Sequence, residues 1–217
     1  MRRTLFDWVG SQECLYCKKV VLDFSERTLC KICLEKIRRL DQLAHLIHLK
    51  KQYFSEAVSV AVYEGPWMEL IHQWKFSHMQ DVFHVFADHL RETTLPQFSY
   101  DWILPVPLHP FRLLRRGFNP SGMLAMELSQ THHFPVGNFL KRRWGKKPQV
   151  GLSAELRVEN IKDQFFLPQR HQKKLKKSRC LLVDDVLTTG STVNECARVL
   201  KGSGISSVDV LTLARAL

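Results

Sequence analysis

The chain has 217 residues, of which 45% are hydrophobic and 10% aromatic, so it can form a hydrophobic core and is not a disordered protein. It carries 32 Lys and Arg against 21 Asp and Glu, a net charge of +11 that favours polyanionic partners. No apolar run approaches the roughly 20 residues that span a bilayer, and the basic N-terminus lacks the apolar core of a signal peptide. We therefore expect a cytoplasmic protein without membrane insertion.

Four cysteines near the start of the chain form two Cys-x-x-Cys pairs, Cys14 with Cys17 and Cys30 with Cys33. Two such pairs supply the four thiolates of a tetrahedral Zn²⁺ site, and a complete four-cysteine set leaves no open position for a substrate. The spacing therefore predicts one structural zinc ion. The alternatives are a redox dithiol or four free cysteines, although in a reducing compartment such pairs bind metal more often than they form disulfides.

Apolar residues recur at helical spacing after Cys33, which predicts a helix over residues 34–51. This helix would pack the cysteine module against the remainder of the chain. We place a domain boundary near residue 52, with a zinc ribbon and linking helix over 1–52 and a main domain over 53–217.

The main domain alternates between strand and helix patterns. Such alternation implies an α/β fold with a parallel sheet covered on both faces. The expected strands are 57–63, 101–106, 180–184 and 207–213, and the expected helices are 67–76, 82–90, a stretch within 117–130, and 193–201.

The stretch CLLVDDVLTTGST, residues 180–192, is the strongest candidate site. An apolar strand ends on two acids, and a loop rich in hydroxyl groups then opens a helix. Gly190 allows close backbone approach, and amides at a helix N-terminus attract an anion. Paired carboxylates suit sugar hydroxyls or a metal, so the site suits a phosphorylated sugar; the alternative is an ordinary capped turn with two solvated acids. The candidate residues are Asp184, Asp185, Thr188, Thr189, Gly190, Ser191 and Thr192.

Two basic segments could add to this site. The first follows the strand at 101–106, where guanidinium groups would match pyrophosphate oxygens; the alternative is a solvated basic turn. The second, 141–157, is a candidate flap that could bind nucleic acid, and Trp67 and Trp74 could also stack on bases unless they belong to the core. The candidates are Val106, Arg112, Arg115 and Arg116 for anions, and Lys141, Arg142, Arg143, Trp144, Lys146 and Lys147 for nucleic acid.

The residues VDDVLTTGST resemble the phosphoribosyl pyrophosphate (PRPP) signature of type I phosphoribosyltransferases. The rest of the chain resembles the ComF/GntX family in the two cysteine pairs, in Tyr63-Glu64-Gly65 with Lys75-Phe76, in segment 101–119, and in a block from Gln149 to Asn160. The chain departs from the family at Pro120, where relatives usually carry Gln. The resemblance implies a type I phosphoribosyltransferase-like sheet with an N-terminal zinc ribbon, PRPP bound with Mg²⁺, and a pyrophosphate loop at Val106.

The resemblance implies a protein that handles single-stranded DNA entering the cell during natural transformation. A second hypothesis is a nucleotide-salvage phosphoribosyltransferase, and a third is a PRPP-sensing regulator of a helicase or recombination protein. No general base and no nucleobase pocket can be assigned from the sequence, so the catalytic residues are unknown and transferase activity is an open question. DNA affinity that falls with salt and pyrophosphate release from PRPP would separate the first two hypotheses.

Overall fold

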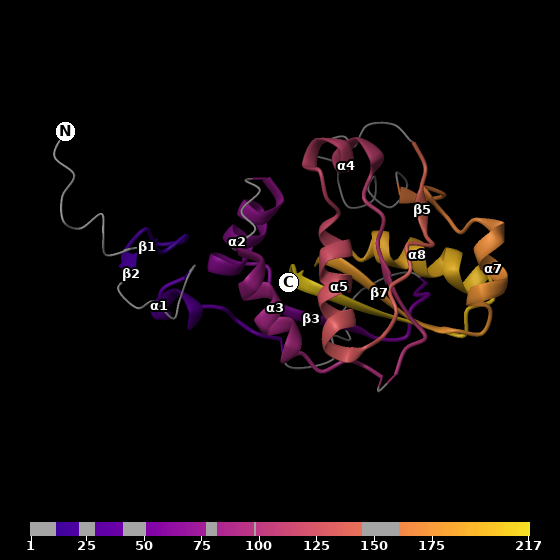
Figure 1. Cartoon of the computed structure of the whole chain (residues 1–217), viewed down its shortest axis with the longest axis horizontal. Helices are drawn as coiled ribbons and strands as arrows, with labels where there is room; N and C mark the ends of the chain where they lie inside the picture. Colours follow the sequence, from indigo (N-terminus) through magenta and orange to yellow (C-terminus); the bar gives the residue numbers. More distant parts are fainter. Residues whose placement is uncertain (1–11, 22–28, 41–50, 77–81, 98, 145–160) are drawn as a thin grey trace.

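The computed structural model describes residues 12–21, 29–40, 51–76, 82–97, 99–144 and 161–217. Its strands are β1 (Gln12–Glu13), β2 (Val20–Val21), β3 (Ala57–Val62), β4 (Trp102–Pro105), β5 (Lys141–Arg142), β6 (Phe165–Phe166), β7 (Arg179–Leu187) and β8 (Ser207–Arg215). Its helices are α1 (Lys31–Leu34), α2 (Gly65–Phe76), α3 (Val82–Arg91), α4 (Pro110–Arg116), α5 (Pro120–His132), α7 (Gln169–Leu175) and α8 (Ser191–Gly202). Figure 1 shows the cysteine-bearing module at one end of the molecule and the main domain at the other.

A four-stranded sheet in the order β3-β8-β7-β4 forms the centre of the main domain. All three pairings are parallel, which confirms the predicted α/β class. β7 pairs with β8 from Arg179 to Leu187, whereas β4 pairs with β7 only as far as Pro105 opposite Val183. The carboxyl half of β7 therefore continues beyond the end of its neighbour.

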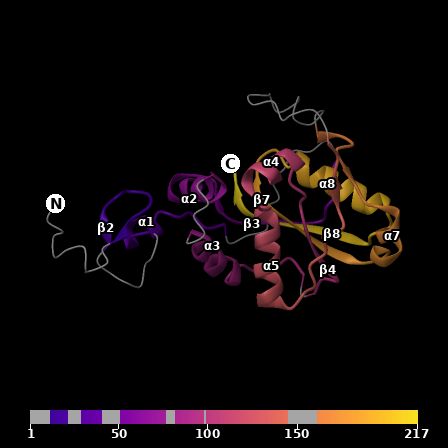
Figure 2. The ribbon, with the colours of Figure 1, turned by 45° about the horizontal axis from the view of Figure 1, so that its top comes forward.

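Helices cover both faces of this sheet (Figure 2). Successive side chains of a strand point to opposite faces, so β7 contributes to two cores. Leu181 and Val183 pack with residues of α2, α3 and α5, and Cys180 and Leu182 pack with residues of α7 and α8. None of the helices among the described residues is long and apolar enough to cross a membrane.

The predicted helix over residues 34–51 is wrong in its first part. Residues 37–40 are extended and lie against the outer edge of β3, where the Leu40 amide donates to the Val60 carbonyl at 3.0 Å and the Val62 amide donates to the Arg38 carbonyl at 2.9 Å. An edge strand presents unpaired amides and carbonyls, and pairing with them outweighs the helical spacing of a few leucines. Residues 41–50 of this prediction lie outside the described residues, and the boundary near residue 52 stays a prediction.

The basic segment after β4 contains a short helix that the periodicity did not predict. Pro110 occupies the first turn of α4, the His109 ring accepts a hydrogen bond from the Phe111 amide at 3.2 Å, and Gly117 ends the helix at a φ of 80°. α4 has only 7 residues, and its apolar residues Phe111, Leu113 and Leu114 are exposed, so the segment is too short to show a recurring helical pattern. Pro120, which stands where relatives usually carry Gln, is the first residue of α5, a position at which the fixed φ of proline is favourable.

Trp67 and Trp74 belong to the core, so of the two alternatives left open by the sequence, core packing is correct and stacking on bases is not. Trp67 is 0% exposed and Trp74 is 1% exposed. The Trp67 indole donates to the Leu213 carbonyl at 2.8 Å, and both rings pack against Phe86 with centroids 5.0 and 5.2 Å away. Their spacing on α2 suits a helix face packed on a sheet as well as a stacking platform, and only the fold distinguishes the two.

Candidate anion site and four-cysteine cluster

The acidic pair lies where β7 has lost its neighbour β4. The last contact between these strands is the Val106 amide, which donates to the Val183 carbonyl at 2.9 Å. Asp184 and Asp185 follow at once, and the strand continues to Leu187, three residues beyond its predicted end at Asp184. In parallel sheets, ligands bind beyond the carboxyl ends of the strands, and β4 ends here.

Asp184 carries the most strongly perturbed carboxyl group of the pair. Its Oδ1 accepts hydrogen bonds from the Ser121 hydroxyl and from the Asp185 amide, both at 2.9 Å. Burial, followed by the charge of Asp185, raises the pKa of Asp184 to about 7, although these hydrogen bonds and Lys75 oppose the rise. The site therefore holds a carboxyl group that is near its titration midpoint at neutral pH.

Asp185 forms an ion pair with Lys75, whose Nζ lies 2.9 Å from Oδ1. The two side chains are only 17% and 13% exposed, so the pair is largely withdrawn from water. Lys75 lies near the end of α2, more than a hundred residues away in the sequence. Neither Lys75 nor Ser121 was predicted as a site residue, because no local pattern links either of them to the acidic pair.

Replacing Lys75 with Met should destabilise the protein at neutral pH by roughly 2–4 kcal/mol, because it leaves Asp185 poorly solvated without its cation. The second replacement Asp185→Asn should restore most of this loss, since it removes the uncompensated charge. Urea unfolding of the single and double variants at pH 7 measures both effects. Lys173→Met on the exposed helix α7 is the matched control; equal effects of the two lysine variants would contradict the assignment.

The loop after the acidic pair has the geometry of an anion-binding turn. Gly190 adopts a φ of 74° as the N-cap of α8 and has no side chain to cap the helix, while the Thr189 hydroxyl oxygen accepts a hydrogen bond from the Ser191 amide at 3.4 Å. The hydroxyls of Thr189 and Ser191 lie 2.9 Å apart, Thr188 is exposed, and Thr192 is partly buried in the first turn. A helix N-terminus that begins at a glycine offers its remaining backbone amides and a positive dipole to an anion.

Arginines from two other segments surround the carboxylates. Burial lowers the pKa of Arg116 while the charge of Asp185 raises it, and burial lowers the pKa of Arg142 while the charge of Asp184 raises it. Arg112 repels both arginines, so it belongs to the same group, and Arg115 lies close enough to lower the pKa of Arg116. Of the predicted anion-binding arginines, Arg116 thus interacts with the acidic pair while Arg112 and Arg115 lie near Arg116, and Arg142, predicted only for nucleic acid, interacts with the pair as well.

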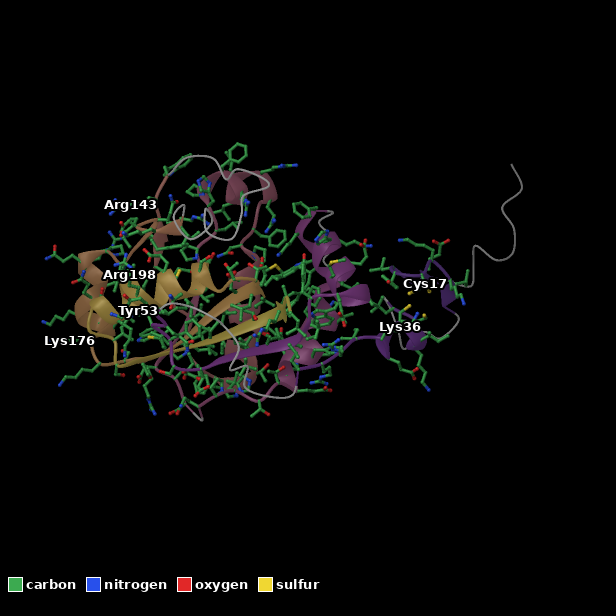
Figure 3. All side chains as sticks on the ribbon, turned by 180° about the vertical axis from the view of Figure 1, so that it is seen from behind. Cys17, Lys36, Tyr53, Arg143, Lys176 and Arg198 are labelled. Atoms are coloured by element: carbon green, nitrogen blue, oxygen red, sulfur yellow. The ribbon has the colours of Figure 1, made fainter. Side chains whose placement is uncertain are left out.

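The start of the predicted flap forms a small ribbon, β5 with β6, in which arginine side chains stack on phenylalanine rings. Arg142 lies over Phe165 at 5.2 Å and Arg143 lies over Phe166 at 5.0 Å. Lys141 and Arg143 are exposed, and Trp144 is 80% exposed. Lys146 and Lys147 lie outside the described residues, as does the block from Gln149 to Asn160. Figure 3 shows Arg143 at the end of the molecule opposite Cys17.

The four predicted cysteine ligands converge in the N-terminal module. All four sulfur atoms lie within 4.8 Å of one another, and the Cys17 and Cys30 sulfurs are 3.7 Å apart. A tetrahedral site with Zn–S bonds of about 2.3 Å requires S···S separations of about 3.8 Å, so the cluster fits zinc. The knuckle at the first pair closes through the Cys14 amide, which donates to the Lys19 carbonyl at 2.8 Å, with Lys18 at a φ of 61°.

The pKa values of Cys14 and Cys33 are shifted in opposite directions. Burial raises the pKa of Cys14, but backbone amides around it prevail and lower the value to about 6. Burial and the neighbouring thiols raise the pKa of Cys33 to about 12. A divalent cation would relieve the repulsion that keeps the last proton in place.

Comparison with known proteins links the chain to one group of relatives. Residues 113–217 match the model of the phosphoribosyl transferase domain. The chain is 30% identical to Competence protein F of Haemophilus influenzae over 94% of this chain and 96% of that protein. It is 38% identical to the DNA utilization protein YhgH of Escherichia coli K12 over 74% and 72% of the two chains. It is 23% identical to Competence protein ComFC of Streptococcus pneumoniae over 97% of this chain and 84% of that protein.

Solved structures similar to this chain include phosphoribosyltransferases. The match to adenine phosphoribosyl transferase from Trypanosoma brucei covers 79% of this chain and 73% of that chain, with a TM-score of 0.43 and 12% identity. The match to orotate phosphoribosyltransferase from Aeropyrum pernix covers 83% of this chain and 76% of that chain, with a TM-score of 0.39 and 17% identity. The matched domain and the parallel sheet with flanking helices agree with the predicted type I phosphoribosyltransferase-like fold.

Proposed function

The chain belongs to the ComF family of type I phosphoribosyltransferase-like proteins, and from this membership we propose that it binds PRPP at the acidic pair and handles single-stranded DNA during DNA uptake. The proposal has two parts, a small anionic ligand and a polyanionic partner. Each part rests on different residues.

The observation that carries the PRPP part is the arrangement of opposite charges around the acidic pair. The 5′-phosphate would take the loop of residues 188–192, where α8 begins at the N-cap glycine, Gly190. Asp184 and Asp185 would accept hydrogen bonds from the ribose hydroxyls. Arg116 and Arg142, which feel the charges of the carboxylates, would neutralise the pyrophosphate together with the neighbouring Arg112. Mg²⁺ bound with PRPP would supply further neutralisation of the pyrophosphate.

The DNA part rests on charge and on the names of the relatives. The net charge of +11 creates a field that attracts phosphodiester backbones. The exposed residues Lys141, Arg143 and Trp144 stand beside the arginines of the acidic pair, since Arg142 joins the two groups. Relatives that match nearly the whole chain are named for competence and for DNA utilization.

The first test is fluorescence anisotropy of a labelled oligothymidine with the intact, zinc-loaded chain, with and without Mg²⁺ and PRPP. We expect affinity to fall by roughly 20-fold between about 50 and 200 mM salt if three phosphates are neutralised, because each contributes a slope of about 0.7 for single strands. Heparin should compete with the oligonucleotide. Absence of binding even at the lower salt concentration would refute the DNA part of the proposal. A calorimetric titration with PRPP that shows no binding would refute the PRPP part.

A second candidate function, nucleotide-salvage phosphoribosyltransferase, is favoured by the match to the transferase domain over residues 113–217. In that reaction a base nitrogen bonds to C1 of PRPP as the bond to pyrophosphate breaks. Pyrophosphate release measured with each nucleobase in turn distinguishes it from PRPP binding alone. Regulation of a helicase or recombination protein by PRPP would instead appear as a partner interaction that depends on PRPP.

A further inference from the structure

A pocket of about 430 Å³ opens between α3 and α5, outside the proposed PRPP site. Its volume falls within the range of roughly 300–1,000 Å³ of small-molecule sites. Apolar side chains of both helices and of the turn before α5 form most of its wall, among them Phe83, Phe118, Met123 and Met126. We propose that this pocket receives one unpaired base of single-stranded DNA while Arg115 of α4 holds the adjoining phosphate, an inference that rests on the DNA part of the proposed function.

The aromatic wall of the pocket is held in place by a buried tryptophan. Trp74, 1% exposed, packs against Phe83 with ring centroids 5.7 Å apart and against Phe118 with centroids 5.9 Å apart. The positions of the two phenylalanine rings are therefore fixed before any ligand arrives. Flat rings and polarisable methionine sulfur suit the π-face of a nucleobase of any identity.

Polar groups at the pocket match the edge of a base. Asn119, Gln130 and Asn138 contribute carboxamides, which can both donate and accept hydrogen bonds. The Asn119 amide group donates to the Val106 carbonyl at 3.0 Å, while its buried Oδ1 has no hydrogen-bond partner among the described residues. A buried acceptor without a partner costs free energy, and the N3–H of thymine or the exocyclic amine of another base would supply the missing donor.

The charges around the pocket suit a phosphodiester backbone. The one acid among its lining residues, Glu127, is neutralised by Arg91 at 2.7 Å. α4 leads directly into the pocket, since Phe118 and Asn119 follow its final turn, and Arg112 and Arg115 are exposed on it. A base in the pocket thus places its neighbouring phosphates beside a helix whose only charged residues are arginines.

The side of α5 on which the pocket lies argues against a pocket for the free nucleobase that would react with PRPP. Residues of a helix turn by about 100° each, so Ser121, which contacts Asp184, and Met123 or Met126 lie on nearly opposite sides of α5. The helix therefore separates the pocket from the acidic pair. A base on the side of α5 away from Ser121 is more readily explained as part of a strand than as a free acceptor base for PRPP.

The test fills the pocket without removing any side chain. Gly122 lines the pocket, and a Cβ added there meets only Asn119 atoms at 3.6 Å or more, so Gly122→Leu is tolerated by the helix and occupies the space for the base. Gly202→Leu in α8, where an added Cβ meets nothing within 4 Å, is the matched control. Zinc content and thermal unfolding of both variants establish that the chain is intact.

We expect Gly122→Leu to weaken binding of a labelled oligothymidine about tenfold, the loss typical of one stacked base, while the salt slope stays unchanged and Gly202→Leu binds as the unmodified chain does. Arg115→Gln should instead reduce the salt slope by about 0.7. An oligonucleotide of abasic sites should bind the unmodified chain more weakly and be insensitive to Gly122→Leu.

The inference is overturned if the unmodified chain binds the oligothymidine and Gly122→Leu binds it equally well, an outcome that leaves the proposed function intact. It is also overturned if Trp144→Ala removes the preference for oligothymidine over the abasic strand and Gly122→Leu does not, which would assign base stacking to the ribbon of β5 and β6. Loss of thymidine binding in Gly122→Leu with unchanged oligonucleotide binding would assign the pocket to free nucleosides, and likewise overturns it. Absence of any DNA binding by the unmodified chain would refute the proposed function itself.

Discussion

Replacing Asp184 with Asn is expected to stabilise the folded protein at pH 8 and to weaken PRPP binding at the same time. The amide keeps the oxygen that accepts hydrogen bonds from Ser121 and the Asp185 amide, but it carries no charge to be desolvated. Since burial raises the pKa of Asp184 to about 7, ionising this group costs free energy in the native state. We expect a gain of roughly 2–4 kcal/mol, since each tenfold change in the acidity of a group corresponds to about 1.4 kcal/mol.

The pH dependence follows from the direction in which burial moves this pKa. Below pH 4 Asp184 is protonated in both states, so Asp184→Asn should change stability little. As pH rises from 4 to 7, the unfolded chain releases this proton more readily than the native protein, whose pKa is about 7, and native stability falls. Above pH 7 the cost is complete, and the advantage of the variant should be constant.

Urea unfolding of both proteins at pH 4 and pH 8 measures this difference, with Asp88→Asn, an exposed position on α3, as the control. PRPP binding by the variant should weaken roughly 10- to 100-fold, the equivalent of one charge-assisted hydrogen bond of about 1.5–3 kcal/mol. A stabilised variant that binds PRPP normally would remove Asp184 from the proposed site. A variant that is destabilised at pH 8 would contradict the desolvation of its carboxyl group.

Replacing Cys33 with Ser is expected to abolish zinc binding and to unfold the N-terminal module. Metal binding contributes on the order of 10 kcal/mol to the folding of small four-ligand zinc modules. Cys33 is buried and, with Cys14, Leu29 and Ile37, belongs to the same core cluster as Trp74 of α2. Loss of the module should therefore expose part of the apolar surface of α2 and lower the solubility of the chain.

Elemental analysis of protein purified without chelators should return one zinc per chain, and none for Cys33→Ser. Limited proteolysis should then cleave the variant before residue 52 while sparing the intact protein. Cys196→Ala, which removes a buried thiol of α8 outside the cluster, should retain the metal. An unmodified chain that contains no zinc would contradict the metal assignment, and the four thiols would then need a redox or purely packing role.

Sequence alone determined the parts of this protein whose residues are close together in the chain. The two cysteine pairs predict a four-thiol cluster because each knuckle is a local turn, and the sulfurs do meet. Strands and helices of the main domain follow from apolar periodicity, since burial on one face of an element leaves that spacing in the sequence. Gly190 and its neighbouring hydroxyls likewise predicted the turn that opens α8.

Only the tertiary structure decided which distant groups meet the acidic pair. Lys75, Ser121 and Arg142 come from three separate elements. The ion pair of Lys75, the hydrogen bond of Ser121 and the charge interaction of Arg142 with the acidic pair depend on how α2, α5 and β5 lie against the sheet. The continuation of β7 past Asp184 depends on its pairing with β8. The sequence does not predict this continuation, because the two acidic residues interrupt the apolar pattern of the strand. Residues 37–40 are extended for the same kind of reason, because the free edge of β3 satisfies backbone groups that a helix would otherwise have paired.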